Sequence, residues 1–287
     1  MLEQNHKNGV HAQKLIALQR EDGAWGHFHS LSQISGSPVT TEQALRRLER
    51  LGFTKSDPPI QKALSYMRAC LAGEKEIPDR REKTHDWDMF TRTMLAAWIR
   101  RFTKADALAN EIAAQWGKTV SAAYEDGHYD HGAYLAAYRG TFGARPFGGR
   151  LIDFRAFYEI SLVSATLDPR VERAFSEDVL SHPTGIYYVY GATLLSPPED
   201  FSSKDASRYL AAVELMLEYE SPACRTLLSP AAKWLKAHRG ADGLWDMGAK
   251  VKDNIYFPLS DSWRTASDRK RDCTERIMRA LERLEKA

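Results

Sequence analysis

The sequence predicts a single all-α domain, residues 1–287, built from repeated helical units. Two similar segments lie near the ends of the chain, Asp22-Gly23-Ala24-Trp25 and Asp242-Gly243-Leu244-Trp245, and each follows a run with helical character. Between them, apolar residues recur at helical spacing, and only 185–190 and 254–257 look extended. Repeats of this kind are typical of proteins made of similar stacked units. Because no Gly/Ser-rich or Pro-rich linker divides the chain, we expect one domain.

Helix boundaries follow from local signals. One helix begins at Thr40-Thr41-Glu42 and is closed by Gly52. Another begins at Asp57-Pro58 and is closed by Gly73, since Asp caps a helix and proline suits its first turn. With the helix before Gln19, apolar periodicity predicts about eleven helices, the others at 88–102, 105–123, 131–142, 151–167, 169–180, 204–219, 222–238 and 268–284.

Composition narrows the function classes. The chain has 40 basic and 38 acidic residues, a net charge of +2. A net charge this small does not indicate a nucleic-acid-binding protein. No apolar run approaches the roughly 20 residues that span a bilayer, and no signal peptide is expected. Three scattered cysteines do not form a disulfide framework, which favours a cytoplasmic location. We therefore expect a cytoplasmic protein without a transmembrane segment.

The terminal repeats have an architectural interpretation. Gly23 and Gly243 can adopt the positive φ that ends a helix, and the tryptophans Trp25 and Trp245 can then fold back over the helix end. Gly-x-aromatic triplets also recur inside the chain, which favours a repeat unit of two helices and their loops. We expect these tryptophans to clamp helices and not to act in catalysis.

The first repeat is similar to one in a known superfamily. Lys14, Gln19 and Gly23-Ala24-Trp25 together resemble the QW-type repeat of terpenoid cyclases, with related units in protein prenyltransferase β subunits. The second copy has His238 where that family has Gln. The resemblance implies an α/α toroid whose central cavity holds a small hydrophobic or isoprenoid ligand, with no cofactor. Prenyltransferases bind zinc, but Asp272-Cys273 lacks the spacing of that site, so no metal is expected.

The segment His85-Asp86-Trp87-Asp88 resembles the Asp-x-Asp-Asp acid of class II terpenoid cyclases, with Met89 in the last place. The resemblance implies Asp86 and Asp88 as catalytic acids, with His85 beside them and Trp87 against the ligand. A carboxyl group that protonates an alkene must stay protonated in an apolar pocket. The alternative is that both aspartates cap the helix that begins here.

Two arginines and two histidines are further candidates for ligand binding. Arg145 and Arg150 flank a glycine-containing turn and can hold a phosphate group, although a plain turn between helices is the alternative. His27 and His29 follow the first tryptophan and can point toward the mouth of the cavity.

The segment 246–264 is long for a loop between helices. It carries Tyr256 and Trp263, which suit either a lid over a cavity or a packed surface loop. A second charged segment, 125–131, contains two histidines, and we interpret it as a solvated loop and not a metal site.

Three functions remain open. The first is a terpenoid cyclase-like or prenyltransferase-like protein that binds an isoprenoid. The second is a carbohydrate-active α/α toroid, a hydrolase or a lyase, whose cleft is lined by Trp and Tyr (7 and 12 in the chain). The third is a non-catalytic toroid that binds a lipid or a protein, for which the sequence names no partner. An apolar tunnel favours the first, and an open groove with paired carboxylates favours the second.

Overall fold

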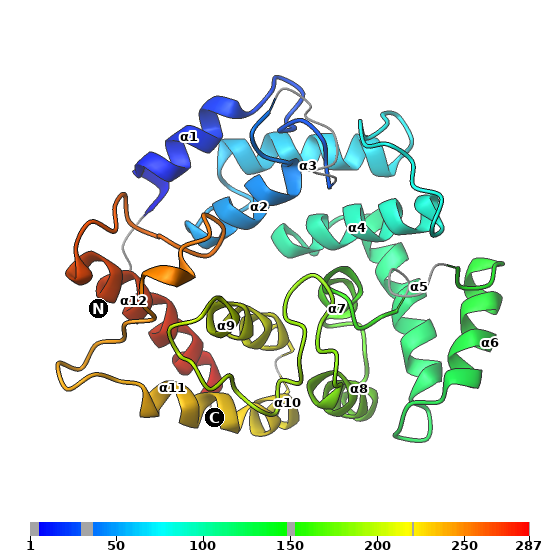
Figure 1. Ribbon diagram of the computed structural model, residues 1–287. Coiled ribbons are helices and arrows are strands. Elements are labelled where there is room, and N and C mark those ends of the chain that lie inside the picture. The colour runs from blue at the N-terminus through cyan, green and yellow to red at the C-terminus, as the bar shows by residue number, and fades with distance from the viewer. Residues whose placement is uncertain (1–5, 30–36, 148–152, 220, 287) are drawn as a thin grey trace.

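The computed structural model describes residues 6–29, 37–147, 153–219 and 221–286 (Figure 1). The described residues form twelve α-helices and two short 3-10 helices, at His6–Asn8 and Ala249–Val251. The α-helices are α1 (Val10–Leu18), α2 (Thr41–Arg50), α3 (Pro58–Leu71), α4 (Trp87–Phe102), α5 (Ala107–Ala123), α6 (His131–Phe142), α7 (Phe157–Val163), α8 (Pro169–Ser181), α9 (Lys204–Met216), α10 (Pro222–Leu227), α11 (Ser229–Ala237) and α12 (Ala266–Leu284). The predicted all-α class is confirmed.

Two predicted helices differ from those observed. The helix expected at 151–167 is confined to α7, because Ala156 forms a bridge to Tyr187 before it begins; residues 151 and 152 lie outside the described part. The helix expected at 222–238 is divided into α10 and α11. Pro230 lies in the first turn of α11, where a residue without an N–H interrupts the helical ladder. The segments expected to be extended form no strand among the described residues, only isolated bridges at Tyr187 and Ile186.

Local chemistry explains where the helices begin. Thr40 and Gln43 form a reciprocal capping box at the start of α2. Asp86 caps α4 by accepting a hydrogen bond from the Met89 N–H at 3.0 Å, and Asp130 caps α6 in the same way. The predicted burial of α4 is also confirmed, since it packs against α3, α5 and α7.

The two terminal tryptophans clamp helices as predicted. Trp25 Nε1 donates to the Leu15 carbonyl at 2.6 Å, and Trp245 Nε1 donates to the Leu235 carbonyl at the same distance. The indoles are 0% and 2% exposed. Gly23 has φ +95°, and a Cβ there would lie 2.3 Å from the Lys62 carbonyl oxygen, so only glycine fits this turn.

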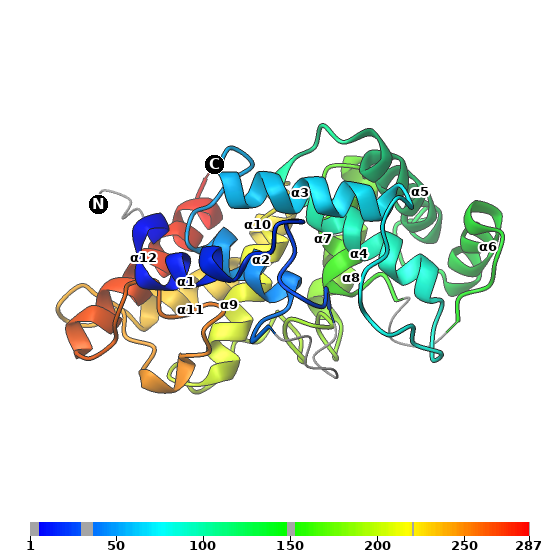
Figure 2. The same ribbon diagram turned by 90° about the horizontal axis from the view of Figure 1, so that it is seen from above.

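The beginning and the end of the described chain are in contact. His6 Nε2 lies 3.0 Å from a carboxylate oxygen of Glu275, and the Val10 N–H donates to Asp261 at 2.7 Å. In Figures 1 and 2, α2, α4, α7 and α9 lie toward the middle of the molecule and α6 projects at one edge. Buried side chains of these helices form one hydrophobic core. Of the helices described, none is both long and apolar enough to cross a membrane.

Candidate functional site

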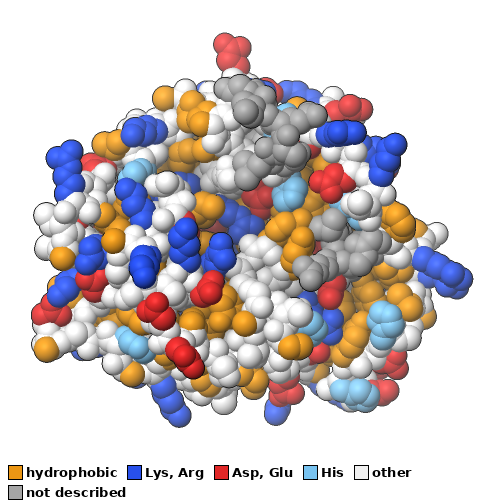
Figure 3. Space-filling model, viewed as in Figure 1, with side chains coloured by type: hydrophobic (Ala, Val, Ile, Leu, Met, Phe, Trp, Pro, Cys, Tyr) orange, Lys and Arg blue, Asp and Glu red, His pale blue; other side chains and the backbone are white. Residues whose placement is uncertain are grey.

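A cavity of about 590 Å³ lies where the N-terminal half of α2 meets α9 and four loops. Figure 3 shows a hollow near the middle of this face, with basic, acidic and histidine side chains in its wall. The lining combines charged and aromatic side chains from segments far apart in the sequence, among them His29, Glu42, Arg46, Tyr188, Arg208 and Tyr256. The wall of the cavity therefore combines charged groups with apolar surface, and its chemistry depends on how the charged groups contact one another.

His29 is held by a buried carboxylate on one side and faces a tyrosine on the other. Its Nδ1 lies 2.8 Å from a Glu42 carboxylate oxygen, and Tyr158 donates its hydroxyl proton to the same oxygen at 2.8 Å. Because an ionised carboxylate only accepts, Nδ1 carries the proton and Nε2 is the acceptor of the neutral ring. Nε2 lies 3.4 Å from the Tyr188 hydroxyl. This arrangement leaves a basic nitrogen at the cavity.

The charges around His29 favour the protonated form of its ring. Burial disfavours the imidazolium, but the hydrogen bond and the charge of Glu42 outweigh it and raise the pKa of His29. Burial likewise acts to raise the pKa of Glu42, but Arg46, 2.8 Å away, and His29 lower it to about 2. Glu42 is therefore ionised at any physiological pH and stabilises the positive charge that His29 acquires on accepting a proton.

The backbone before α2 fixes the position of His29. Asp79 accepts hydrogen bonds from the N–H groups of Phe28 and His29, the latter at 2.8 Å. The first N–H groups of α2, on Thr41 and Glu42, donate to the carbonyls of residues 27 and 28 at 2.8 and 3.0 Å. These N–H groups have no partner within the helix itself. The start of α2 and the segment that carries His29 thus hold each other in register.

Tyr188 occupies an unusual backbone conformation. Its φ is +68°, a region that side chains other than glycine adopt rarely and that recurs at functional sites. Burial, and after it the neighbouring Tyr187, raises the pKa of the Tyr188 phenol. The hydroxyl therefore keeps its proton at neutral pH and can donate it. Tyr188 and His29 together form an acid and a base within one cavity.

The two predicted acids lie elsewhere. Asp86 is the N-cap of α4, and Asp88 is a surface residue, 66% exposed, whose carboxylate lies 2.7 Å from Arg81. Both positions are typical of carboxylates that interact with a helix N-terminus. Asp86 therefore makes the contact of the capping alternative given above, whereas Asp88 pairs with Arg81 at the surface, and no contact of either carboxylate supports an acid role.

His85 and Trp87 lie behind the cavity and do not line it. Both are buried, and their rings contact Phe90 at centroid distances of 5.0 and 5.7 Å. Phe90 in turn contacts the His29 ring at 5.2 Å. Burial lowers the pKa of His85, so its ring stays neutral at physiological pH. These two residues support the site through packing.

The remaining predicted ligand-binding residues divide between the cavity and the loops around it. Tyr256 lines the cavity, and its role in ligand binding stays a prediction. Trp263 instead donates its indole N–H to Asp272 at 2.6 Å and anchors that loop. His27 is buried beside the clamp, and Arg145 is exposed after α6. Arg150 lies outside the described residues.

Sequence reasoning missed several residues of the site: Glu42, Arg46, Tyr158, Tyr188 and Arg208. One signal was present: after the second clamp, Thr41-Glu42 with Arg46 recurs as Thr274-Glu275 with Arg279, and in both copies the Arg follows the Glu by four residues. In both copies the Thr hydroxyl accepts the tryptophan backbone N–H at 3.0 Å, and the Glu pairs with the Arg four residues later. Recognising this longer repeat would have placed Glu42 beside the first clamp.

The described residues contain no candidate metal site. No group of three or more His, Cys, Asp or Glu side chains is placed there to hold a metal ion. Comparisons with protein-family models, curated proteins and solved structures find no match. What the protein does must therefore be argued from the cavity itself.

Proposed function

We propose that the chain is an α/α toroid and that this cavity, with its charged and aromatic lining, is the active site of a lyase that cleaves an anionic carbohydrate. Contact between the ends of the chain supports the closed ring, as does the second clamp, which repeats the geometry of the first. The free cysteines, Cys70, Cys224 and Cys273, fit the cytoplasmic location that the sequence predicts.

One observation carries the assignment: His29 is oriented by Glu42 and presents Nε2 to Tyr188 at the wall of an open cavity. A base of this kind takes a proton from carbon when a neighbouring group stabilises the negative charge that develops. Arg208 in the lining can supply that stabilisation to a carboxylate, since Arg46 is already paired with Glu42. Tyr188 and Tyr256 offer aromatic faces of the kind that stack on sugar rings.

These groups are sufficient for β-elimination from a uronate. His29 Nε2 accepts the proton on the carbon next to the substrate carboxylate, and the electron pair forms an enolate that a guanidinium stabilises. The C–O bond to the adjoining sugar then breaks, and Tyr188 donates its proton to the leaving oxygen. The products are a new free sugar end and a sugar with a C=C bond conjugated to its carboxylate. The 3.4 Å contact between His29 and Tyr188 lets the proton return to Tyr188.

Elimination fits the cavity better than hydrolysis or isoprenoid binding. Hydrolysis requires a carboxyl group that is protonated at the start, whereas Glu42 is held ionised by Arg46 and His29. An isoprenoid site requires an apolar wall, whereas this lining carries Glu42, Arg46, Arg208 and Asp253. Isoprenoid binding therefore stays a prediction from the resemblance, without support from the cavity.

The test is an activity screen with polymeric uronates as substrates. We expect ultraviolet absorbance from the conjugated double bond to accumulate, and we expect His29→Ala and Tyr188→Phe to lower kcat by about a hundredfold or more. His131→Ala, an exposed histidine at the start of α6, is the matched control.

Each alternative function gives a different outcome in the same experiments. New reducing ends without a double bond would replace elimination by hydrolysis. Turnover or tight binding of a prenyl diphosphate, with no effect on uronates, would overturn the proposal in favour of the isoprenoid prediction. The proposed catalytic roles of His29 and Tyr188 would be wrong if no polymeric uronate is turned over. They would also be wrong if His29→Ala and Tyr188→Phe are as active as the control.

A further inference from the structure

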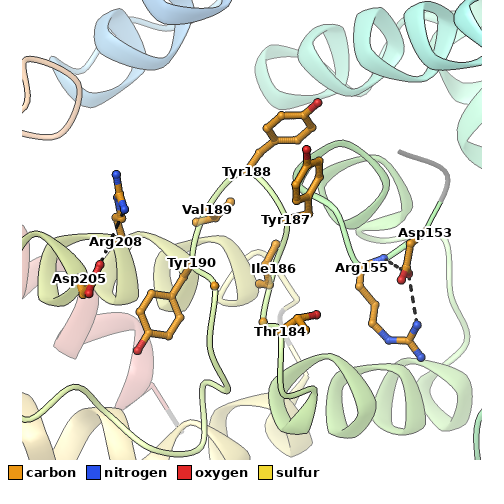
Figure 4. Close-up of a pocket in the computed structure, with 12 residues that line it drawn as sticks. Asp153, Arg155, Thr184, Ile186, Tyr187, Tyr188, Val189, Tyr190, Asp205 and Arg208 are labelled. Carbon is orange, nitrogen blue, oxygen red and sulfur yellow. Dashed lines mark hydrogen bonds and ion pairs between the residues drawn. The ribbon is translucent and has the colours of Figure 1, made fainter. Parts of the chain in front are cut away.

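A second cavity, of about 510 Å³, adjoins the first along the loop 184–191 (Figure 4). The two cavities share Tyr188, Val189 and Arg208 in their linings. Because Tyr188, Val189 and Arg208 line both spaces, the two cavities form two halves of one groove, and the loop 184–191, which we call the ridge, runs through it. Each half has a volume typical of a site for a drug-sized ligand, so the groove exceeds what one small molecule fills.

The ridge is a rigid part of the fold. The Ile186 N–H donates to the Tyr190 carbonyl at 2.8 Å, and Tyr187 exchanges backbone hydrogen bonds with Arg155 and Phe157 at 3.0 and 3.1 Å. Gly185 has φ +61°, and a Cβ there would lie 2.3 Å from the Tyr190 carbonyl oxygen. A loop tied at both ends in this way keeps its tyrosines in place, as a binding surface requires.

Side chains on and beside the ridge suit an acidic sugar chain. The rings of Tyr187 and Tyr188 are 4.2 Å apart between centroids at the top of the loop, as Figure 4 shows. Arg208 is 58% exposed and lies 3.7 Å from Asp205, a long and solvated pair whose guanidinium is available to a ligand carboxylate. Arg155, by contrast, is already engaged by Asp153 and Asp178 at 3.2 and 2.7 Å.

We propose that the substrate is a polymer that crosses this ridge and fills both cavities, so that the enzyme cleaves within the chain. This inference rests on the proposed lyase function. The scissile linkage lies beside His29 in the first cavity, and sugar units on one side of it extend over the tyrosines into the second. Binding energy from the second cavity is then gained only by substrates long enough to reach it.

Gly191 allows a direct test. It lines the second cavity, its φ is not positive, and a Cβ added there meets nothing within 4 Å, so Gly191→Trp adds a bulky side chain to this lining without a clash at its Cβ. Gly140→Trp is the matched control, since a Cβ at this exposed α6 position also meets nothing. We expect Gly191→Trp to lower kcat/KM on the polymer about tenfold and to leave the shortest cleaved oligomer within about twofold.

A binding measurement makes the test independent of turnover. Calorimetry with polyuronate and with the short oligomer is carried out on His29→Ala, with and without Gly191→Trp. Preferential loss of polymer affinity in the double variant supports the ridge-crossing chain. The ridge-crossing chain would be overturned, while the lyase function stands, by either of two results. One is equal polymer affinity with and without Gly191→Trp, and the other is the same kcat/KM on the polymer for Gly191→Trp and Gly140→Trp. If uronates are neither bound nor cleaved, both proposals fail together.

Discussion

The two ends of the chain contain the same helical unit, used for different purposes. In both, a tryptophan clamps the preceding helix, and a Thr-Glu pair follows on the next one. In the first unit the glutamate, Glu42, contacts His29 from the same unit. In the last unit the corresponding Glu275 contacts His6, from the opposite end of the chain. One histidine–carboxylate pair therefore lines a cavity, and the other joins the ends of the fold.

The segment after each tryptophan accounts for the difference. After Trp25 the chain runs through residues 27–29 across the start of α2, which brings His29 to Glu42. After Trp245, Asp246 instead forms a bidentate pair with Arg269 of α12 at 2.6 and 2.7 Å. The same clamp is thus used in both units, and a few residues beside it decide whether the histidine–carboxylate pair lines a cavity or joins the ends of the fold.

The largest expected effect tests what the units share. Trp25→Ala and Trp245→Ala should each lower the free energy of unfolding by about 4 kcal/mol, because each removes a fully buried indole and its hydrogen bond. Urea denaturation gives both values. Trp234→Ala, at a half-buried indole, should cost less. Markedly unequal losses at the two clamps would show that the units are not equivalent.

The next effect tests where the units differ. Glu42→Gln should lower the free energy of unfolding by about 3 kcal/mol, since Arg46 is left buried without its partner carboxylate, and should abolish the proposed lyase activity. Glu275→Gln should cost about 1 kcal/mol, because Arg279 is 38% exposed and solvent replaces the carboxylate. Denaturation and kcat are measured on both variants. Loss of activity in Glu275→Gln would contradict the division of roles.

The threonines that link clamp and helix should behave alike. Thr41→Val and Thr274→Val should each lower the free energy of unfolding by about 1–2 kcal/mol. In each variant the buried backbone N–H of the clamping tryptophan loses its acceptor. Thermal and urea unfolding provide the comparison, with Thr226→Val, at an exposed position, as the control. A neutral effect at either site would mean that the hydrogen bond is dispensable there.

A smaller effect separates a helix cap from a catalytic acid. Asp86→Ala should destabilise the protein by about 1 kcal/mol, as should Asp130→Ala at the start of α6, since each removes an N-cap. Activity should persist in both. If Asp86→Ala alone abolished turnover, the acid role implied by the resemblance to terpenoid cyclases would be restored.

The smallest effect is a pH dependence confined to the first unit. Because the folded protein raises the pKa of His29 above 6.5, its stabilising contribution is fully present below that pH and is lost as pH rises through the folded-state pKa. Glu42 makes no change in this window, since its pKa of about 2 lies far below it. Unfolding free energies measured across this range should vary less in His29→Gln than in His131→Gln. Identical pH profiles of the unfolding free energy in the two variants would show that the contact between His29 and Glu42 does not contribute to this pH dependence.

The sequence by itself determined the helical class, most helix starts and both tryptophan clamps. These features depend on local chemistry: aspartate and threonine cap the turn beside them, and glycine permits a turn within four residues of the tryptophan. The division between α10 and α11 was also written locally, in Pro230. The resemblance implies catalytic acids at Asp86 and Asp88, whereas the structure has a helix cap at Asp86 and a surface ion pair at Asp88.

Only the tertiary structure decided which polar residues meet. Tyr158 and Tyr188 reach His29 across 129 and 159 positions of the sequence, and no spacing rule connects them. Glu42 looked like an ordinary first-turn acid until the fold buried it between Arg46 and His29, where desolvation and charge pairing changed its role. The start and end of a helix depend on residues that are neighbours in the sequence. A site depends on side chains that are distant in the sequence and that only folding brings together.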